Sequence, residues 1–226
     1  MIQIQNLTKS YGRKAVLQSI STCFEDGKVY GIVGQNGAGK TTLFRCLAGL
    51  EPYTGEIIAS QSPLKCCLGL LTVEPYYMAK MTGEEYIYLL TDARGIRLKD
   101  LEEKNIFQLP LKDYVSNYST GMKKKLALTA VLLQDNRYYI FDEPYNGIDL
   151  ESSMLLTAII QELKARGKTV ILSSHIFSTL KDCCDEILLL DQGRIQKTVQ
   201  RENFDALEDE MKDRVLMLDI EKLIGK

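Results

Sequence analysis

The chain has 226 residues, which is enough for one large α/β domain or two small ones. Hydrophobic residues make up 45% and charged residues 26%, ordinary values for a globular protein and unlike those of a disordered one. The net charge of −2 gives no electrostatic reason to expect a nucleic-acid partner, and no run approaches the roughly 20 apolar residues of a membrane-spanning helix. The first residues lack the apolar core of a signal peptide, so we expect a cytosolic location.

Short strands come first in the chain. The apolar patterns of Ile2–Leu7 and Val16–Phe24 predict two antiparallel strands on either side of a turn at residues 11–13. Thr54–Ile58 adds a further strand-and-turn unit. We therefore expect an antiparallel β subdomain in the N-terminal part of the protein.

Strand-like apolar runs alternate with helical stretches from about residue 28 to residue 190. The predicted strands are Val29–Val33, Tyr138–Phe141, Val170–Ser173 and Glu186–Leu190. The predicted helices are Thr41–Ala48, Met122–Leu133, Glu151–Ala165 and Phe177–Cys183. This alternation is typical of an α/β fold with a mainly parallel sheet and helices on both faces.

Helical patterns dominate from about residue 74 to residue 133, where large apolar and aromatic side chains are frequent. We interpret this segment as a helical subdomain inserted into the α/β core of one domain that spans residues 1–226. The expected C-terminal tail, from about residue 196 to residue 226, includes an amphipathic stretch at Phe204–Leu218.

One segment matches the phosphate-loop pattern G-x-x-x-x-G-K-[ST] in full: Gly34, Gln35, Asn36, Gly37, Ala38, Gly39, Lys40 and Thr41. It follows a predicted strand and opens a predicted helix, which is the context of a true phosphate loop. Backbone N–H groups and a helix N-terminus would surround the phosphates of ATP, and Lys40 would reach the β- and γ-phosphates. The Thr41 hydroxyl would bind Mg²⁺, and we include the neighbouring Thr42 in the predicted nucleotide site.

Two carboxylates, Asp142 and Glu143, follow the apolar strand Tyr138–Phe141. The carboxyl ends of strands are where open α/β sheets bind ligands. Asp142 could hold Mg²⁺, commonly through its water shell, and Glu143 could polarise the water that attacks a phosphate. Downstream of a phosphate loop, this pair predicts a site of ATP hydrolysis.

With these motifs the chain resembles the ATP-binding cassette (ABC) ATPases. Residues 118–122, Tyr-Ser-Thr-Gly-Met, are similar to the family signature LSGGQ, with the first glycine and the glutamine replaced. The resemblance implies that Ser119 and Gly121 bind the γ-phosphate of ATP held by an opposite subunit. A helix cap at Ser119 is the structural alternative. The resemblance covers roughly residues 2–195.

The resemblance also implies roles for three residues outside these motifs. Asp149 matches the aspartate of the family's D-loop, and His175 lies at the place of the switch histidine. Tyr11 matches the aromatic residue that stacks on adenine. The imidazole of His175 would donate a hydrogen bond to the γ-phosphate and help couple hydrolysis to subunit opening.

One position departs from the family pattern. The glutamine that in the family contacts Mg²⁺ and relays motion to the membrane partner falls on Val73, with Glu74 beside it. Either Glu74 substitutes for the glutamine or the contact is missing. The aromatic and methionine side chains that follow would line an apolar groove for a partner helix, or else pack the helical subdomain.

These patterns predict an ATPase that works as a pair of cassettes, in a homodimer or heterodimer, and energises a separate transmembrane permease at the inner face of the membrane. We expect an exporter that uses ATP and Mg²⁺. The alternatives are a soluble ABC ATPase that acts on ribosomes or DNA, and a non-catalytic regulatory subunit that binds ATP. Retention of Glu143 and His175 argues against the last alternative.

The six cysteines contain no C-x-x-C pair, and the chain has one histidine. We interpret the cysteines as small apolar residues that fill core space in a reducing compartment, which leaves a metal site or disulfides poorly supported. The basic run Lys123-Lys124-Lys125 is interpreted as a solvated helix face.

Overall fold

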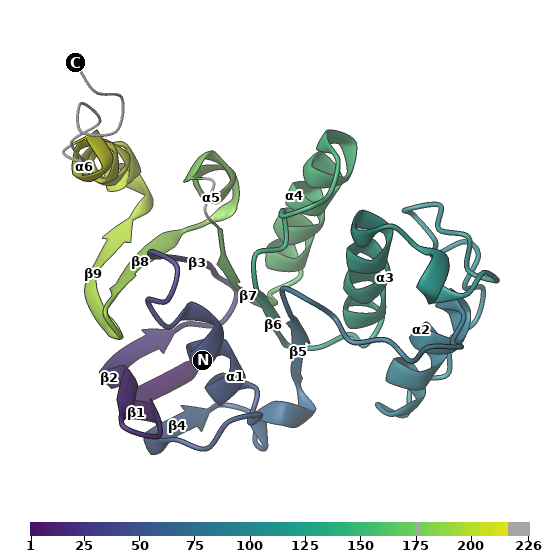
Figure 1. The fold of residues 1–226 in the computed structure, drawn as a ribbon, viewed down its shortest axis with the longest axis horizontal. Coiled ribbons are helices and arrows are strands. Elements are labelled where there is room, and N and C mark those ends of the chain that lie inside the picture. Colours follow the sequence, from purple (N-terminus) through teal and green to yellow (C-terminus); the bar gives the residue numbers. More distant parts are fainter. Residues whose placement is uncertain (175–176, 217–226) are drawn as a thin grey trace.

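A three-stranded antiparallel sheet lies at one end of the protein. The computed structural model describes the backbone of residues 1–174 and 177–216, with side chains up to residue 211. The sheet has the order β2-β1-β4 and consists of β1 (Ile2–Tyr11), β2 (Lys14–Phe24) and β4 (Thr54–Ala59) (Figure 1). Ile2 and Ile4 are buried before, and Leu7 and Lys9 after, a shift in the pairing register of β1, so the strand buries alternate residues on each side of this irregularity.

The central sheet has six strands. Their order is β5-β6-β7-β3-β8-β9, and all neighbours are parallel except β8 and β9. The strands are β5 (Leu68–Leu71), β6 (Tyr138–Phe141), β7 (Thr169–Ser173), β3 (Val29–Val33), β8 (Glu186–Asp191) and β9 (Arg194–Gln200). Every residue of β3, β6 and β7 is buried, because these central strands are covered on both faces.

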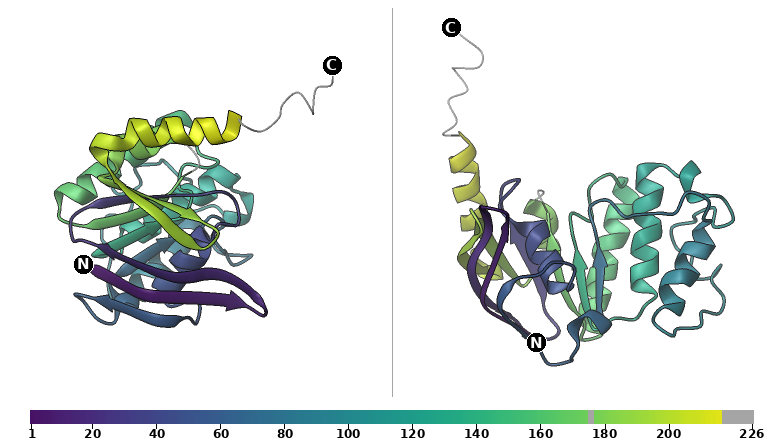
Figure 2. Two further views of the ribbon diagram at one scale, coloured as in Figure 1. Left: turned by 90° about the vertical axis from the view of Figure 1, so that its left-hand side faces the viewer. Right: turned by 60° about the horizontal axis from the view of Figure 1, so that its bottom comes forward.

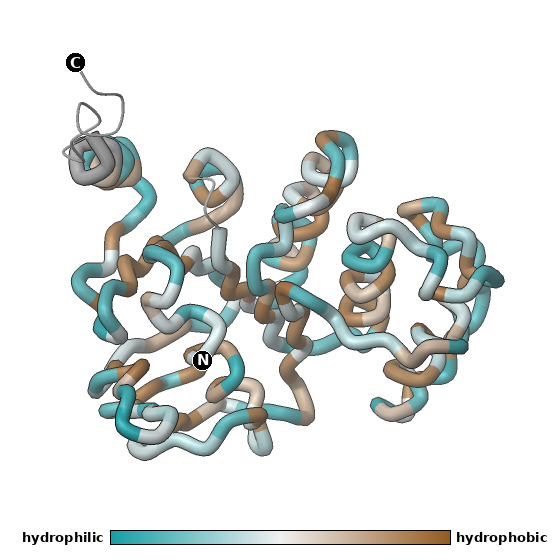
Figure 3. The backbone as a smooth tube through the Cα atoms, in the orientation of Figure 1, coloured by the Kyte–Doolittle hydropathy of each residue, from teal (hydrophilic) through white to brown (hydrophobic). Residues whose placement is uncertain are grey.

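The two faces of the central sheet pack against different layers. On one face, α1 (Lys40–Leu47) and the antiparallel sheet share a core with alternate strand residues such as Ile140 and Ile171. On the other face, α4 (Leu150–Ala165), α5 (Phe177–Cys183) and α6 (Phe204–Leu216) pack against the intervening strand residues. Figure 3 shows the hydrophobic stretches gathered in the strands between these layers. The expected α/β fold with an antiparallel β subdomain is confirmed.

A helical subdomain lies beside the central sheet, as the right-hand view of Figure 2 shows. It contains α2 (Gly83–Asp92), a 3₁₀ turn η2 (Val115–Asn117) and α3 (Thr120–Leu132), around a separate small core. The Thr82 and Glu85 side chains form a capping box at the start of α2. The expectation that helices dominate residues 74–133 is only partly right, because residues 93–114 contain no helix. Their apolar side chains, Leu101, Leu109 and Leu111, enter the core from irregular chain.

Two strands and two 3₁₀ turns were not expected. β5 is a short strand at the sheet edge, preceded by η1 (Leu64–Cys66). β9 lies inside the segment expected to be a tail and pairs with β8, before η3 (Arg201–Asn203). The amphipathic stretch noted at residues 204–218 is helical over its described part, as α6. Among the helices of the described segments, none has the length and apolar character needed to cross a bilayer.

The cysteine interpretation is right for half of the residues. Cys46, Cys183 and Cys184 are buried in the two main cores. Cys23 and Cys66 are exposed and Cys67 is half-buried, because β2 and η1 present them on the outer side of their elements. Cys23 and Cys66 therefore do not fill core space, whereas Cys67 packs against the edge of a core.

Candidate nucleotide-binding and catalytic site

The phosphate loop connects the end of β3 to the start of α1, as its sequence predicts. Two positions of the loop require glycine, because a Cβ atom there would come too close to neighbouring atoms. A Cβ at Gly34 would lie 2.1 Å from the Leu190 carbonyl oxygen of β8, and a Cβ at Gly39 would lie 2.8 Å from Leu17. Gly39 also has a φ of +112° directly before α1. The loop is thus held tightly against its neighbours, with the N-terminus of α1 opening from it.

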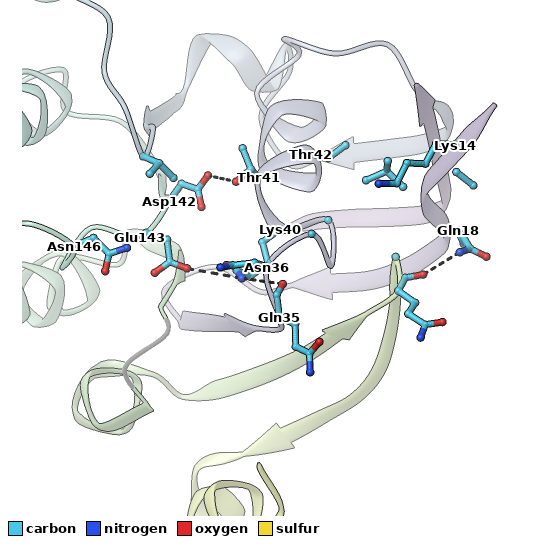
Figure 4. Close-up of a pocket in the computed structure, with 17 residues that line it drawn as sticks. Lys14, Gln18, Gln35, Asn36, Lys40, Thr41, Thr42, Asp142, Glu143 and Asn146 are labelled. Carbon is cyan, nitrogen blue, oxygen red and sulfur yellow. Dashed lines mark hydrogen bonds and ion pairs between the residues drawn. The ribbon is translucent and has the colours of Figure 1, made fainter. Parts of the chain in front are cut away.

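Lys40 lies between the phosphate loop and Glu143. Its ammonium group donates to the Gly34 carbonyl at 2.6 Å and lies 3.9 Å from the Glu143 carboxylate (Figure 4). Only 7% of Lys40 is exposed. Burial lowers the pKa of Lys40, and the charges of Glu143 and Asp142 oppose this shift. A positive charge is therefore placed in a loop whose backbone can also bind phosphate.

Asp142 is held by hydroxyl groups from two sides. Thr41 donates to one carboxylate oxygen at 2.6 Å, and Ser173 at the end of β7 donates to the other at 2.8 Å. The Ser173 oxygen also accepts the backbone N–H of Glu143 at 2.9 Å. Ser173 was not predicted as a site residue. Sequence alone does not single it out, because the pairing of β7 with β6 is what brings this hydroxyl to the Asp142 carboxylate and the Glu143 main chain.

The oxygen atoms around Asp142 fit a hard divalent cation. Carboxylate and hydroxyl oxygens are the ligands that Mg²⁺ prefers, and it is commonly held by one or two carboxylates together with substrate phosphates. Within the part of the chain that the structure describes, no cluster of three or more acidic, histidine or cysteine side chains could hold a metal alone. Thr41 and Asp142 thus suit a cation that arrives with the nucleotide.

Glu143 follows Asp142 with an unusual backbone conformation. Its φ of +50° lies in the left-handed region, which few residues other than glycine adopt. The side chain is 5% exposed and points toward Lys40 (Figure 4). Such strained residues cluster at functional sites.

A cavity of about 550 Å³ joins these groups. Described residues from the sequence-predicted set line it: Gln35, Asn36, Gly37, Gly39, Lys40, Thr41, Thr42, Asp142 and Glu143. Gly34 and Ala38 belong to the same loop but do not line the cavity. Further lining residues come from distant parts of the chain and were therefore missed: Lys14 and Gln18 of β2, and Gln192 in the β8–β9 turn. Asn146, close to Glu143 in the chain, also lines the cavity and was not predicted as a site residue. Gln18 donates to the Gln192 carbonyl at 3.0 Å, which closes this side of the cavity.

Tyr11 does not line this cavity. It lies at the end of β1, 43% exposed, with the Lys9 ammonium 4.6 Å from the centre of its ring. Its partner across the turn, Lys14, does line the cavity. Stacking of adenine on Tyr11 therefore stays a prediction, as do the roles of the other site residues.

The signature residues also lie outside the cavity. Ser119 is the N-cap of α3 and accepts the Met122 N–H at 3.2 Å, which is the helix-cap alternative. Gly121 allows close packing, since a Cβ there would lie 2.7 Å from the Gly147 carbonyl oxygen. Both residues retain exposed surface. Neither is brought to the chain's own phosphate loop, and this is the arrangement expected if they serve a second subunit.

Asp149 is the last residue of the segment that connects Glu143 to α4. It caps α4 and forms an ion pair with Lys125 at 2.6 Å. The Lys125 ammonium, together with the Ser152 N–H, holds the pKa of Asp149 well below its usual range. His175 lies outside the described residues.

Val73 and Glu74 lie where the central sheet meets the helical subdomain. Val73 lines the cavity that contains Lys40, whereas Glu74 lines a neighbouring cavity of about 370 Å³ together with Thr41 and Asp142. Glu74 thus lines a cavity together with the predicted metal ligands Thr41 and Asp142.

Comparison with known proteins agrees with this geometry. The family model for the ABC transporter matches residues 17–146, more than half of the chain. The chain belongs to the ABC transporter family, as one of its ATP-binding subunits. It is 31% identical to the lantibiotic transport ATP-binding protein SrtF of Streptococcus pyogenes, over 96% of this chain and 98% of that protein.

Two further similarities extend this result. The Nod factor export ATP-binding protein I of Sinorhizobium fredii is 29% identical over 85% of this cassette and 61% of that protein. A dimeric ATP-binding cassette, MJ0796, bound to ADP and phosphate has the same fold with a TM-score of 0.79 and 18% identity. That match covers 89% of this cassette and 99% of the other chain.

Proposed function

We propose that this cassette hydrolyses ATP to ADP and phosphate and that this energises outward transport through a separate membrane permease. The observation that carries the proposal is the convergence of Lys40, Thr41, Asp142 and Glu143 on one cavity, from the two segments that follow β3 and β6 of the central sheet. Each group has a chemical task in phosphoryl transfer, and the cavity is open to a nucleotide.

Binding depends on charge and backbone donors. The phosphate loop would surround the phosphates, and Lys40 would exchange its contact with the Gly34 carbonyl for a phosphate oxygen. Mg²⁺, held by Thr41 and Asp142, would neutralise charge on the phosphates when bound. Ser173 keeps the Asp142 carboxylate in place for this task.

Hydrolysis requires a group that orients water. Glu143 is buried beside Lys40, so its carboxylate can accept a proton from a water molecule next to the terminal phosphate. His175 would add a hydrogen bond to that phosphate, as the resemblance implies.

A second cassette would complete each site. Ser119, Gly121 and Asp149 lie outside the chain's own cavity and retain exposed surface, so they are available to a nucleotide on a partner. The dimeric state of the similar cassette MJ0796 supports such an arrangement. We propose that ATP joins two cassettes and that hydrolysis releases them.

A groove between the central sheet and the helical subdomain would receive the permease. It has a volume of about 980 Å³ and is lined by apolar residues of β5, α2 and α3 together with Tyr76 and Glu74. Tyr76 is 83% exposed and Met78 is 54% exposed, which suits a helix of the partner. Tyr77 instead packs on Tyr86 and donates to the Lys123 carbonyl, so it serves the subdomain core. Of the predicted aromatic groove, Tyr76 and Met78 remain candidates.

Outward transport is the direction printed in the name of the Nod factor relative.

The central experiment is the substitution Glu143→Gln. The amide keeps the size of the side chain but cannot act as a base, so ATP binding should persist while turnover falls about 100-fold or more. The variant should also form an ATP-dependent dimer on a sizing column. Glu151→Gln, an exposed carboxylate at the start of α4, is the matched control. Turnover of the Glu143 variant at the wild-type rate would refute the assignment.

The transport direction needs a separate experiment with the assembled transporter. The cassette and its permease would be placed in vesicles with the ATP-binding sites facing outward, and cargo movement would be followed after ATP addition. Cargo entering such vesicles corresponds to export from the cell. Cargo leaving them would contradict the proposed direction while leaving the ATPase assignment intact.

A further inference from the structure

Lys124 is a buried lysine in the middle of the signature helix α3. It is 5% exposed, whereas its neighbours Lys123 and Lys125 retain more exposed surface. The interpretation of this basic run as a solvated helix face is therefore wrong for Lys124. The helix turns that residue toward the central sheet, and its long side chain crosses to the segment that follows β6.

The ammonium group of Lys124 binds main-chain oxygens next to the catalytic candidate. It donates to the carbonyl of Glu143 and, at 3.0 Å, to the carbonyl of Asn146. A charged donor shared by two carbonyls is a strong arrangement in a site with little water. The contact closes the turn between residues 143 and 146 from the side of the helical subdomain.

This contact falls on the residue with the unusual backbone. Glu143 has a φ of +50°, and such a conformation persists only where the surroundings determine it. Its N–H donates to Ser173 of β7, and its C=O accepts from Lys124 of α3. Both main-chain polar groups of Glu143 are therefore fixed by side chains from different elements, and these two anchors set where its carboxylate points.

The same helix is in contact with two other functional regions. Its first turn carries Ser119 and Gly121, and the Lys123 carbonyl accepts a hydrogen bond from Tyr77, between the exposed Tyr76 and Met78. A partner that binds at the first turn of α3 or beside Tyr77 could rotate the helix slightly. Such a rotation would move the Lys124 ammonium and with it the Glu143 carbonyl. Lys124 is the direct link in this path between the helix and the carboxylate.

We propose that Lys124 is a positioning residue that holds Glu143 in its hydrolytic orientation and makes ATP hydrolysis depend on the orientation of the signature helix. The proposal rests on the proposed function, in which Glu143 orients the attacking water. Lys124 itself need not touch the nucleotide. A purely structural role would affect folding and nucleotide use together, whereas a positioning role affects the chemical step alone.

The test compares two substitutions in the full chain. Lys124→Met keeps the length and apolar packing of the side chain but removes every donor, and Lys124→Gln keeps a shorter donor group without the charge. We expect kcat for ATP hydrolysis to fall about 10- to 100-fold in Lys124→Met, because a small misplacement of a catalytic group has effects of this size. The KM for ATP should stay within about twofold, since only the chemical step is affected. The kcat of Lys124→Gln should be at least about threefold higher than that of Lys124→Met.

Two controls separate the outcomes. Lys112→Met removes an exposed lysine of the helical subdomain and should leave kcat unchanged. Melting temperatures and the affinity for a slowly hydrolysed ATP analogue show whether each variant is folded and binds nucleotide. If Lys124→Met does not fold, Lys124→Gln carries the test, with a lowered kcat at unchanged KM as the expected result.

Three results would overturn the proposal. The first is a wild-type kcat in a folded Lys124 variant. The second is a loss of ATP affinity that accounts for the whole effect, and the third is an equal loss in both variants without any recovery by glutamine. The Glu143→Gln variant distinguishes a failure of the proposed function from a failure of the role assigned to Lys124. If that variant hydrolyses ATP normally, the proposed function fails; if it is inactive while Lys124→Met is normal, only the role of Lys124 is wrong.

Discussion

The hydroxyl of Ser173 connects the Asp142 carboxylate to the main chain of Glu143, and its removal tests how much this connection contributes. Ser173 is fully buried; it donates to Asp142 at 2.8 Å and accepts from the Glu143 N–H at 2.9 Å. In Ser173→Ala the bond to a charged acceptor is lost, and a buried N–H is left without its partner. Losses of this kind cost about 1–3 kcal/mol each.

The expected loss in the free energy of unfolding is about 2–4 kcal/mol, because Asp142 keeps its bond from Thr41 and alanine leaves only a small void. For a chain of this size, each kcal/mol lowers the melting temperature by about 2–4 °C. The turnover of ATP should fall about tenfold as well, since the Asp142 carboxylate and the Glu143 main chain each lose an anchor.

Urea denaturation followed by circular dichroism measures the stability, and phosphate release measures the turnover. Ser116→Ala, an exposed serine in η2, is the matched control and should change the stability by less than about 0.5 kcal/mol. A change this small in Ser173→Ala would refute the reasoning, because it would mean that the hydroxyl stabilises neither the Asp142 carboxylate nor the Glu143 main chain.

Two further predictions concern the phosphate loop and the departure at residues 73–74. Gly34→Ala places a Cβ 2.1 Å from the Leu190 carbonyl oxygen, so the loop must shift and ATP affinity should fall on the order of 100-fold. Gly37→Ala meets no heavy atom within 4 Å but must adopt a φ of +84°, so the same calorimetric titration shows what backbone strain without a close contact does to ATP affinity. An ATP affinity of Gly34→Ala within about twofold of the wild type would contradict the contact argument. Glu74→Ala should lower basal turnover and raise its Mg²⁺ requirement if Glu74 assists the metal, or abolish only the permease-stimulated turnover if it serves coupling. Glu103→Ala, at an exposed carboxylate, is the control. If Glu74→Ala changes neither the basal nor the permease-stimulated turnover, Glu74 is an ordinary surface carboxylate.

The sequence alone determined the elements whose signal is local. The fully buried strands β3 and β6 were predicted with their observed bounds, because central parallel strands are continuous apolar runs. The phosphate loop and the Asp142–Glu143 pair were also found, since their residue types and spacing follow from the chemistry of phosphate binding. The edge strands β5 and β9 were missed, because β5 has four residues and β9 has a partly exposed, polar pattern.

The tertiary structure alone decided which side chains surround these motifs. Ser173 lies 31 residues after Asp142 and reaches it only through the pairing of β7 with β6. Lys124 looked like one of three solvated lysines, and the packing of α3 turns it inward to the Glu143 carbonyl. Gln192 comes to the cavity because β8 ends beside the phosphate loop. In each case the partner is distant in the chain, and a local pattern contains no information about which distant backbone a side chain will meet.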